Sequence, residues 1–151
     1  MEARWETPMP LTRITLREDT PAATRQAIAD AVHDAMTTVI GIPPGDRFQI
    51  IERRSADELI FDPHYLGVDR HNVVFLQIAL VRGRPDELKQ RLYREIAQRL
   101  AAVGIRPEDL VITLVENDRA DWSIGNGHAQ LLDPELLARH GISAVTPGAS
   151  H

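Results

Sequence analysis

The stretch Gly41-Ile42-Pro43-Pro44-Gly45-Asp46 (GIPPGD) returns 63 residues later as Gly104-Ile105-Arg106-Pro107-Glu108-Asp109 (GIRPED). Both copies follow the pattern Gly-Ile-x-Pro-x-Asp. Glycine ends a helix readily, and proline with aspartate is typical of a turn, so each copy predicts a helix-to-strand connection. Two copies at a fixed offset indicate an internal duplication.

The segments around the two copies repeat as well. Residues 11–16 alternate apolar and polar side chains, which predicts a half-buried strand, and residues 73–81 form a nearly continuous apolar strand. The starts of these strands, Pro10 and Val73, are again 63 residues apart. A strand is therefore expected at the head of each repeat.

One helix is expected within each repeat. The first opens at Asp19-Thr20-Pro21, with a cap residue and then proline at the first helical position, and it ends at Gly41. The second opens after Arg84-Pro85-Asp86 and ends at Gly104. The apolar stripes of the helices match best at an offset of 64, which predicts a one-residue slip between strand and helix. Strands over residues 48–52 and 110–116 complete the two halves.

These elements predict an α+β fold of two layers. Two β-α-β repeats, at about residues 10–54 and 73–117, form a four-stranded mixed sheet with both helices on one face. The other face of the sheet is left apolar and uncovered, so we expect a homo-oligomer. Residues 10–131 form the domain and residues 1–9 an N-terminal extension. A tail over residues 132–151 holds a short helix from Asp133 to Gly141 and disorder from Thr146.

Composition excludes several classes of function. The 151 residues include no cysteine, which rules out thiolate nucleophiles and zinc-thiolate sites. A net charge of −5 and 5% aromatic residues argue against binding to nucleic acid. Of the 17 basic residues only Lys89 is a lysine, so guanidinium groups are plentiful and side-chain amines are scarce. No apolar run approaches the ~20 residues of a membrane helix, and residues 1–8 do not resemble a signal peptide. We expect a cytoplasmic protein that does not bind membranes.

The topology brings four chemically useful residues to one edge of the sheet. Pro10 begins the first strand and Asp46 precedes the second, parallel strand. Arg82 and Arg84 follow the third strand, which runs antiparallel to the first if the halves are related by a pseudo-twofold axis. Two guanidinium groups beside a helix N-terminus are suited to binding a carboxylate.

Several further motifs keep a characteristic order along the chain. They are Met9-Pro10-Leu11, Gly45-Asp46-Arg47-Phe48-Gln49, Phe61-Asp62-Pro63, Tyr65-Leu66-Gly67, Arg82-Gly83-Arg84, Glu116-Asn117, Asp121-Trp122-Ser123 and Gly125-Asn126-Gly127. Over residues 10–130 the chain resembles the tautomerase superfamily, in particular the branch of malonate semialdehyde decarboxylase.

The resemblance implies a homotrimer that needs no cofactor or metal and whose reactive group is an amino-terminal proline amine. Pro10 matches that proline, and Asp46 matches an aspartate that activates water or assists proton transfer. Arg82 and Arg84 match the pair that binds the substrate carboxylate, and Trp122 and Ile124 match the lining of the pocket. The implied activity is tautomerisation or decarboxylation of a small keto, enol or semialdehyde carboxylate. The resemblance does not choose between these reactions and a hydratase, nor does it name the substrate.

The residues before Pro10 depart from the family pattern, because an internal proline is an amide without a basic nitrogen. Two readings remain open. Either the native chain starts at Met9, which is then removed, or the extension blocks Pro10 and leaves a silent trimer that binds a small carboxylate.

Other polar clusters give weaker functional hypotheses. A loop carries two aspartates and two histidines without a spacing that fixes them on one face, so a metal site is the less favoured interpretation; these residues are Asp62, His64, Asp69 and His71. His33 is expected to be structural, Glu116-Asn117-Asp118 to cap a turn, and Lys89 to lie on a solvated helix face.

Overall fold

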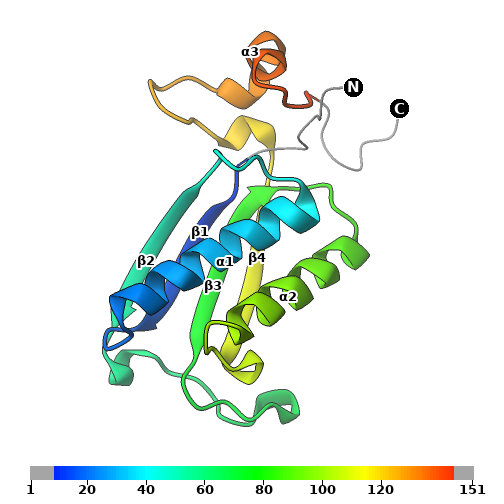
Figure 1. Ribbon diagram of the computed structural model, residues 1–151. Coiled ribbons are helices and arrows are strands. Elements are labelled where there is room, and N and C mark those ends of the chain that lie inside the picture. Colours follow the sequence, from blue (N-terminus) through cyan, green and yellow to red (C-terminus); the bar gives the residue numbers. More distant parts are fainter. Residues whose placement is uncertain (1–8, 145–151) are drawn as a thin grey trace.

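The computed structural model describes residues 9–144. Four strands form one sheet in the order β2-β1-β3-β4. Their bounds are Leu11–Arg17 for β1, Phe48–Arg54 for β2, Val74–Val81 for β3 and Leu110–Asn117 for β4. The helices α1 (Ala22–Ile40) and α2 (Asp86–Ala101) lie side by side across one face of the sheet (Figure 1). The predicted two-layer β-α-β fold is confirmed.

Strand pairing shows the pseudo-twofold relation between the halves. β1 is parallel to β2, β3 is parallel to β4, and the central pair β1–β3 is antiparallel. A shift of 63 residues converts the pair Thr12–Ile78 into the pair Phe75–Thr15, and both pairs occur in the sheet. The 63-residue shift therefore leaves the pairing of the two central strands unchanged, as expected when the two halves arose by duplication.

The core lies between the helices and the sheet. Three residues of α1 and three of α2 are almost completely buried at an offset of 64; they are Ile28, Val32 and Met36, and Leu92, Ile96 and Leu100. They pack against inward-facing strand residues such as Ile14 and Leu76. The predicted one-residue slip between strand and helix is thus present in the core.

Helix ends differ in detail from the expectation. Pro21 is the N-cap of α1 with an extended ψ of 147°, not its first helical residue. The Asp19 carboxylate does not cap the helix but pairs with the Arg17 guanidinium at 2.8 Å. α2 ends at Ala101, and Gly104 takes a positive φ of 93° in the turn that follows. Fixed backbone φ makes proline suitable for the cap position as well as the first turn, which explains the difference.

The connections contain short 3-10 turns. Residues 57–72 form a long loop as expected, with turns at Ala56–Glu58 and Tyr65–Gly67. Further turns lie at Pro107–Asp109, Arg119–Asp121 and Gln130–Leu132.

The C-terminal part of the described chain lies at the Pro10 end of the sheet (Figure 1). The expected short helix is present as α3 (Pro134–Arg139), and the Asp133 carboxylate accepts the Leu136 amide at 3.1 Å as its N-cap. Leu131 and Leu137 form a small apolar cluster with Met9 and Val81. Most of the predicted extension, residues 1–8, and the predicted disorder from Thr146 lie outside the described residues.

The face of the sheet opposite the helices carries exposed apolar side chains. Phe48, Ile50 and Val115 are each about two-fifths exposed there, at 43%, 38% and 43%. None of the helices in the described part of the chain combines the length and apolar character needed to cross a membrane.

Candidate active site

Pro10 lies at the end of the sheet where β1 and β2 begin and β3 ends. It is buried, and the next residue, Leu11, is paired with Phe48 on β2 and with Ala79 on β3. The parallel and antiparallel pairings together bring the loop before β2 and the loop after β3 to this end. The topology thus gathers the predicted site residues at one edge of the sheet.

Asp46 is held against the backbone immediately before Pro10. The Met9 amide donates a hydrogen bond of 2.5 Å to Oδ2 of Asp46. Gly41, in the left-handed conformation, ends α1 and starts the loop that carries Asp46. The buried His33 ring contacts the Pro44 carbonyl in the same loop at 2.9 Å, so this histidine has the structural role expected for it.

Burial dominates the electrostatics of Asp46. Desolvation raises the pKa of Asp46, while the Met9 hydrogen bond and the nearby His33 lower it to a smaller extent. Its second oxygen, Oδ1, is buried without a hydrogen-bond partner among residues 9–144. This oxygen can therefore carry a proton without the loss of a hydrogen bond.

The two arginines follow β3 at the same end of the sheet but have different surroundings. Nε of Arg82 donates to the Asp118 carboxylate at 2.7 Å, and this hydrogen bond is the main cause that raises the pKa of Arg82. The Arg82 side chain is about half exposed, at 54%. Arg84 is buried and donates through Nη1 to the Val81 carbonyl at 2.8 Å. α2 begins two residues after Arg84, so its free amides lie at the same end of the sheet as the two arginines.

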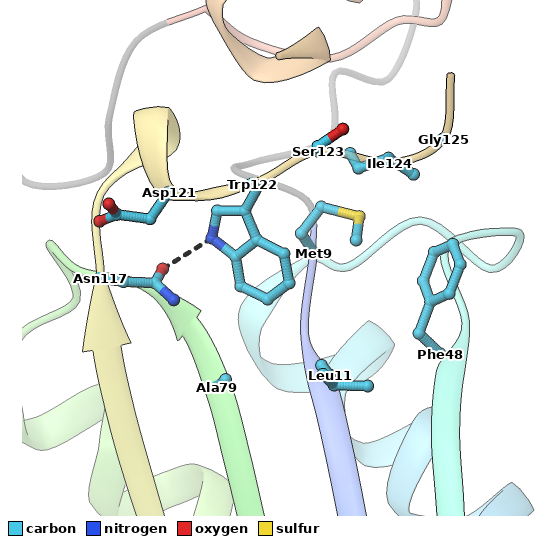
Figure 2. Close-up of a pocket in the computed structure, with 10 residues that line it drawn as sticks. All are labelled: Met9, Leu11, Phe48, Ala79, Asn117, Asp121, Trp122, Ser123, Ile124 and Gly125. Carbon is cyan, nitrogen blue, oxygen red and sulfur yellow. Dashed lines mark hydrogen bonds between the residues drawn. The ribbon is translucent and has the colours of Figure 1, made fainter. Parts of the chain in front are cut away.

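A cavity of about 620 Å³ opens on the sheet surface beside Met9. Figure 2 shows its lining, which is Met9, Leu11, Phe48, Ala79, Asn117, Asp121, Trp122, Ser123, Ile124 and Gly125. Trp122 and Ile124, for which the family resemblance implies a pocket-lining position, are both in this lining. Met9 lies between Trp122 and Phe48 and contributes to a second cavity of about 450 Å³, which Asp46 and Leu137 also line.

The predicted site residues are therefore gathered at one end but not in one cavity. Asp46 lines the second cavity, whereas Pro10, Arg82 and Arg84 line neither of these two. Met9 stands between the two spaces. The Met9 side chain, which is only 6% exposed, fills the volume next to Pro10.

Asp109 occupies the position of Asp46 in the second repeat. It is buried, and its Oδ1 accepts the amides of His71 at 2.7 Å and Asn72 at 3.2 Å. Asn72 corresponds to Met9 in the 63-residue offset. Both aspartates thus bind the backbone immediately before a central strand, and the interaction of Asp46 with Met9 is part of the duplicated fold.

The histidine loop does not have the geometry of a metal site. His71 and His64 approach the Asp69 carboxylate at 2.9 and 3.8 Å, and all three side chains are exposed. Asp62 instead accepts the backbone amide of His64 at 2.8 Å. Among residues 9–144 no group of three or more acidic or histidine side chains is placed to hold a metal ion.

Only some of the polar residues at the end of β4 and just after it have the role that the sequence predicts. Asp118 caps a turn as expected, through reciprocal hydrogen bonds with Asp121. Asn117 has a different role, because its Oδ1 accepts the indole Nε1 of Trp122 at 2.6 Å. The expectation that Lys89 lies on a solvated helix face is wrong, because its ammonium pairs with the Glu116 carboxylate at 3.0 Å and both side chains are partly buried. The spacing in the sequence contains no signal for the Asn117–Trp122 contact, which depends on the path of the turn.

Family models agree with this architecture. A model described as "Tautomerase enzyme" matches residues 46–125, and a second of the same description matches residues 10–69. The chain belongs to the tautomerase family. It is 36% identical over 127 residues to the probable tautomerase YusQ of Bacillus subtilis, a match that covers 83% of this chain and all of the relative. It is 37% identical over 130 residues to the probable tautomerase YrdN of the same organism, covering 85% of this chain and all of YrdN.

Solved structures place this tautomerase family member in the predicted branch. FG41 malonate semialdehyde decarboxylase, inhibited by 3-bromopropiolate, is 40% identical with a TM-score of 0.80, and the match covers 83% of this chain and 96% of that one. A second malonate semialdehyde decarboxylase, described with decarboxylase and hydratase activities, is 33% identical with a TM-score of 0.77 over 83% and 98% of the two chains. A fused 4-OT symmetric trimer shares the fold, at 24% identity and a TM-score of 0.66 over 78% and 94%.

Proposed function

We propose that the chain is a cofactor-independent tautomerase or decarboxylase of small keto, enol or semialdehyde carboxylates. Its reactive group is the secondary amine of Pro10, formed when the preceding residues are removed, and Arg82 and Arg84 bind the substrate carboxylate. The observation that carries this proposal is the hydrogen bond from the Met9 amide to Asp46. This contact places a partly buried carboxyl next to the residue before Pro10, in a chain that belongs to the tautomerase family.

The surroundings of Pro10 act on the pKa of its amine in opposite directions. Burial and two nearby guanidinium groups disfavour the protonated form and lower the pKa of an amine. Asp46 acts in the opposite direction when ionised, because a nearby negative charge favours the protonated amine. The ring of proline leaves the amine few orientations, so it can be held in line with a bound substrate.

Either protonation state supports one of the two reactions. A neutral amine takes a proton from the carbon next to a carbonyl and returns it at the other end of the enol, which completes a tautomerisation. A protonated amine donates a hydrogen bond to a 3-oxo group. The electrons of the breaking carbon–carboxylate bond then form an enolate, carbon dioxide leaves, and the amine gives its proton to the enolate. Neither route needs a cofactor.

The geometry of Met9 supports a second candidate function. Met9 is buried, its amide is bound by Asp46, and its side chain packs with Val81, Leu131 and Leu137. While Met9 remains attached, the Pro10 nitrogen is an amide and cannot transfer protons. The alternative is therefore a catalytically silent member of the fold that binds a small carboxylate through its arginines.

Assembly as a homotrimer is part of the proposal. The apolar side chains on the open sheet face need a partner surface, and a second copy of the same face region supplies one. A fused 4-OT with the same fold is described as a symmetric trimer, which supports this stoichiometry. A cytoplasmic location remains a prediction from the sequence.

The test compares a chain that starts at Met1 with one that starts at Met9. Intact mass shows which chain begins with Pro10, and each is assayed for ketonisation of phenylpyruvate and for decarboxylation of malonate semialdehyde. We expect activity only in the chain with a free Pro10, and loss of that activity in Pro10→Ala and Arg82→Ala variants. Inactivity of the processed wild type, with carboxylate binding retained, would favour the silent alternative.

A further inference from the structure

Asn117 is the last residue of β4 and lies at the mouth of the cavity beside Met9. It is paired with Val81 at the end of β3, and it lines the cavity together with Trp122. β1, β3 and β4 are adjacent strands, so two strand spacings, about 10 Å, separate the backbones of Pro10 and Asn117.

The contact with Trp122 fixes the orientation of the Asn117 amide. An indole N–H can only donate, so the group that it meets at 2.6 Å must be the amide oxygen. The amide nitrogen consequently points the other way, and Figure 2 shows it directed over the sheet toward Ala79. No hydrogen bond of this nitrogen is formed within residues 9–144. Its two N–H donors therefore face the cavity.

Charges around Asn117 determine which substrate oxygen can lie there. Asp121 lines the same cavity, and its Oδ2 accepts the Asp118 amide at 2.9 Å. The Arg82 guanidinium, which is paired with Asp118 and also interacts with Asp121, lies on this side as well and is the charged group suited to a substrate carboxylate. The Asn117 amide nitrogen is an uncharged donor, so it suits the uncharged carbonyl oxygen of the same substrate.

We propose that Asn117 is a substrate-binding residue whose Nδ2 donates a hydrogen bond to the carbonyl or enol oxygen of the substrate. The assignment rests on the proposed function and adds the group that recognises the uncharged oxygen of a keto or semialdehyde acid. A donor at this position also stabilises the negative charge that develops on that oxygen when an enolate forms. Trp122 serves as the positioning residue, because its indole N–H prevents the amide from turning its oxygen toward the substrate.

Binding by a matched pair of acids tests the assignment without turnover. In the chain that starts at Met9, Trp122 is the only tryptophan, because the other tryptophan is Trp5. Its fluorescence reports the binding of 2-oxobutanoate, which has the carbonyl, and of butanoate, which lacks it. We expect the wild type to prefer the keto acid, and Asn117→Asp to reduce that preference about tenfold. The aspartate keeps an oxygen for Trp122 but removes the donors.

Asn72→Asp is the matched control, because it makes the same exchange before β3, at the opposite end of the sheet, and should leave the preference unchanged. Arg82→Ala should weaken both acids equally. An unchanged Trp122 emission maximum without ligand shows that the wall is intact in Asn117→Asp, and Asn117→Ala replaces that variant if it does not fold. An unchanged preference in the Asn117 variants would overturn the assignment, as would an equal loss of both acids. If the wild type prefers the keto acid but turns over no substrate, the enzymatic proposal is refuted and the binding role of Asn117 is kept.

Discussion

Replacement of Asp109 by alanine should destabilise the fold without affecting the candidate site. Oδ1 of Asp109 accepts the His71 amide at 2.7 Å, the Asn72 amide at 3.2 Å and Nη1 of Arg106 at 3.2 Å, and the side chain is 6% exposed. A hydrogen bond to a charged group contributes about 1.5–3 kcal/mol. The residues that donate these bonds are partly exposed and can bind water instead, so we expect a total loss of about 3 kcal/mol. For a domain of this size that corresponds to a melting temperature lower by roughly 6–12 °C.

Thermal and denaturant unfolding of Asp109→Ala beside Glu108→Ala measure this effect. Glu108 is adjacent and also pairs with Arg106, at 3.0 Å, but its side chain is 44% exposed. An exposed ion pair contributes less than about 1 kcal/mol, so this control should be nearly as stable as the wild type. Kinetic constants of the folded Asp109→Ala protein should equal those of the wild type, because Asp109 lies at the opposite end of the sheet. A melting temperature no lower than that of Glu108→Ala would refute the capping role.

The raised pKa of Asp46 gives a pH-dependent expectation for the full-length chain. Because the folded state binds the proton more tightly than the unfolded state, stability relative to Asp46→Asn should fall as pH rises from the ordinary carboxyl pKa through the raised one. Denaturant unfolding at pH 4 and pH 7 measures the difference, and a constant difference would contradict the effect of burial. Ile50→Asp on the open sheet face should convert the expected trimer into monomers in analytical ultracentrifugation, whereas Ala23→Asp on the exposed start of α1 should not. Dissociation of both variants, or of neither, would show that the open face is not the subunit interface.

The duplication explains how much of the fold could be predicted. The 63-residue offset gave both repeats, and the pseudo-twofold relation then required antiparallel central strands, which the pairing of Thr12 with Ile78 confirms. Apolar periodicity sufficed for the helices because burial against the sheet selects one stripe on each. It could not give the cap of α1, because proline is compatible with the N-cap as well as the first turn.

Prediction of the site was limited by side-chain contacts that depend on loop paths. The strand order predicts that Pro10, Asp46 and the arginines lie at one end of the sheet. It does not predict that Met9 lies between two cavities there. The hydrogen bond from Trp122 to Asn117 crosses a turn whose course follows from the Asp118–Asp121 cap. Such a contact follows neither helical nor strand periodicity, so it cannot be predicted from the pattern of residue types.

Asp46 and Asp109 make the same kind of contact at opposite ends of the sheet, so Asp109 can serve as an internal comparison for Asp46. Asp46 and Asp109 bind equivalent backbone positions, yet the 63-residue partner of Arg82 is Asp19, and Met9 corresponds to Asn72. The two ends therefore share the aspartate-to-backbone contact but differ at this position, where one carries an arginine and the other an aspartate. Parallel substitutions at the two ends separate what an aspartate does for folding from what it does for a substrate, within a single polypeptide.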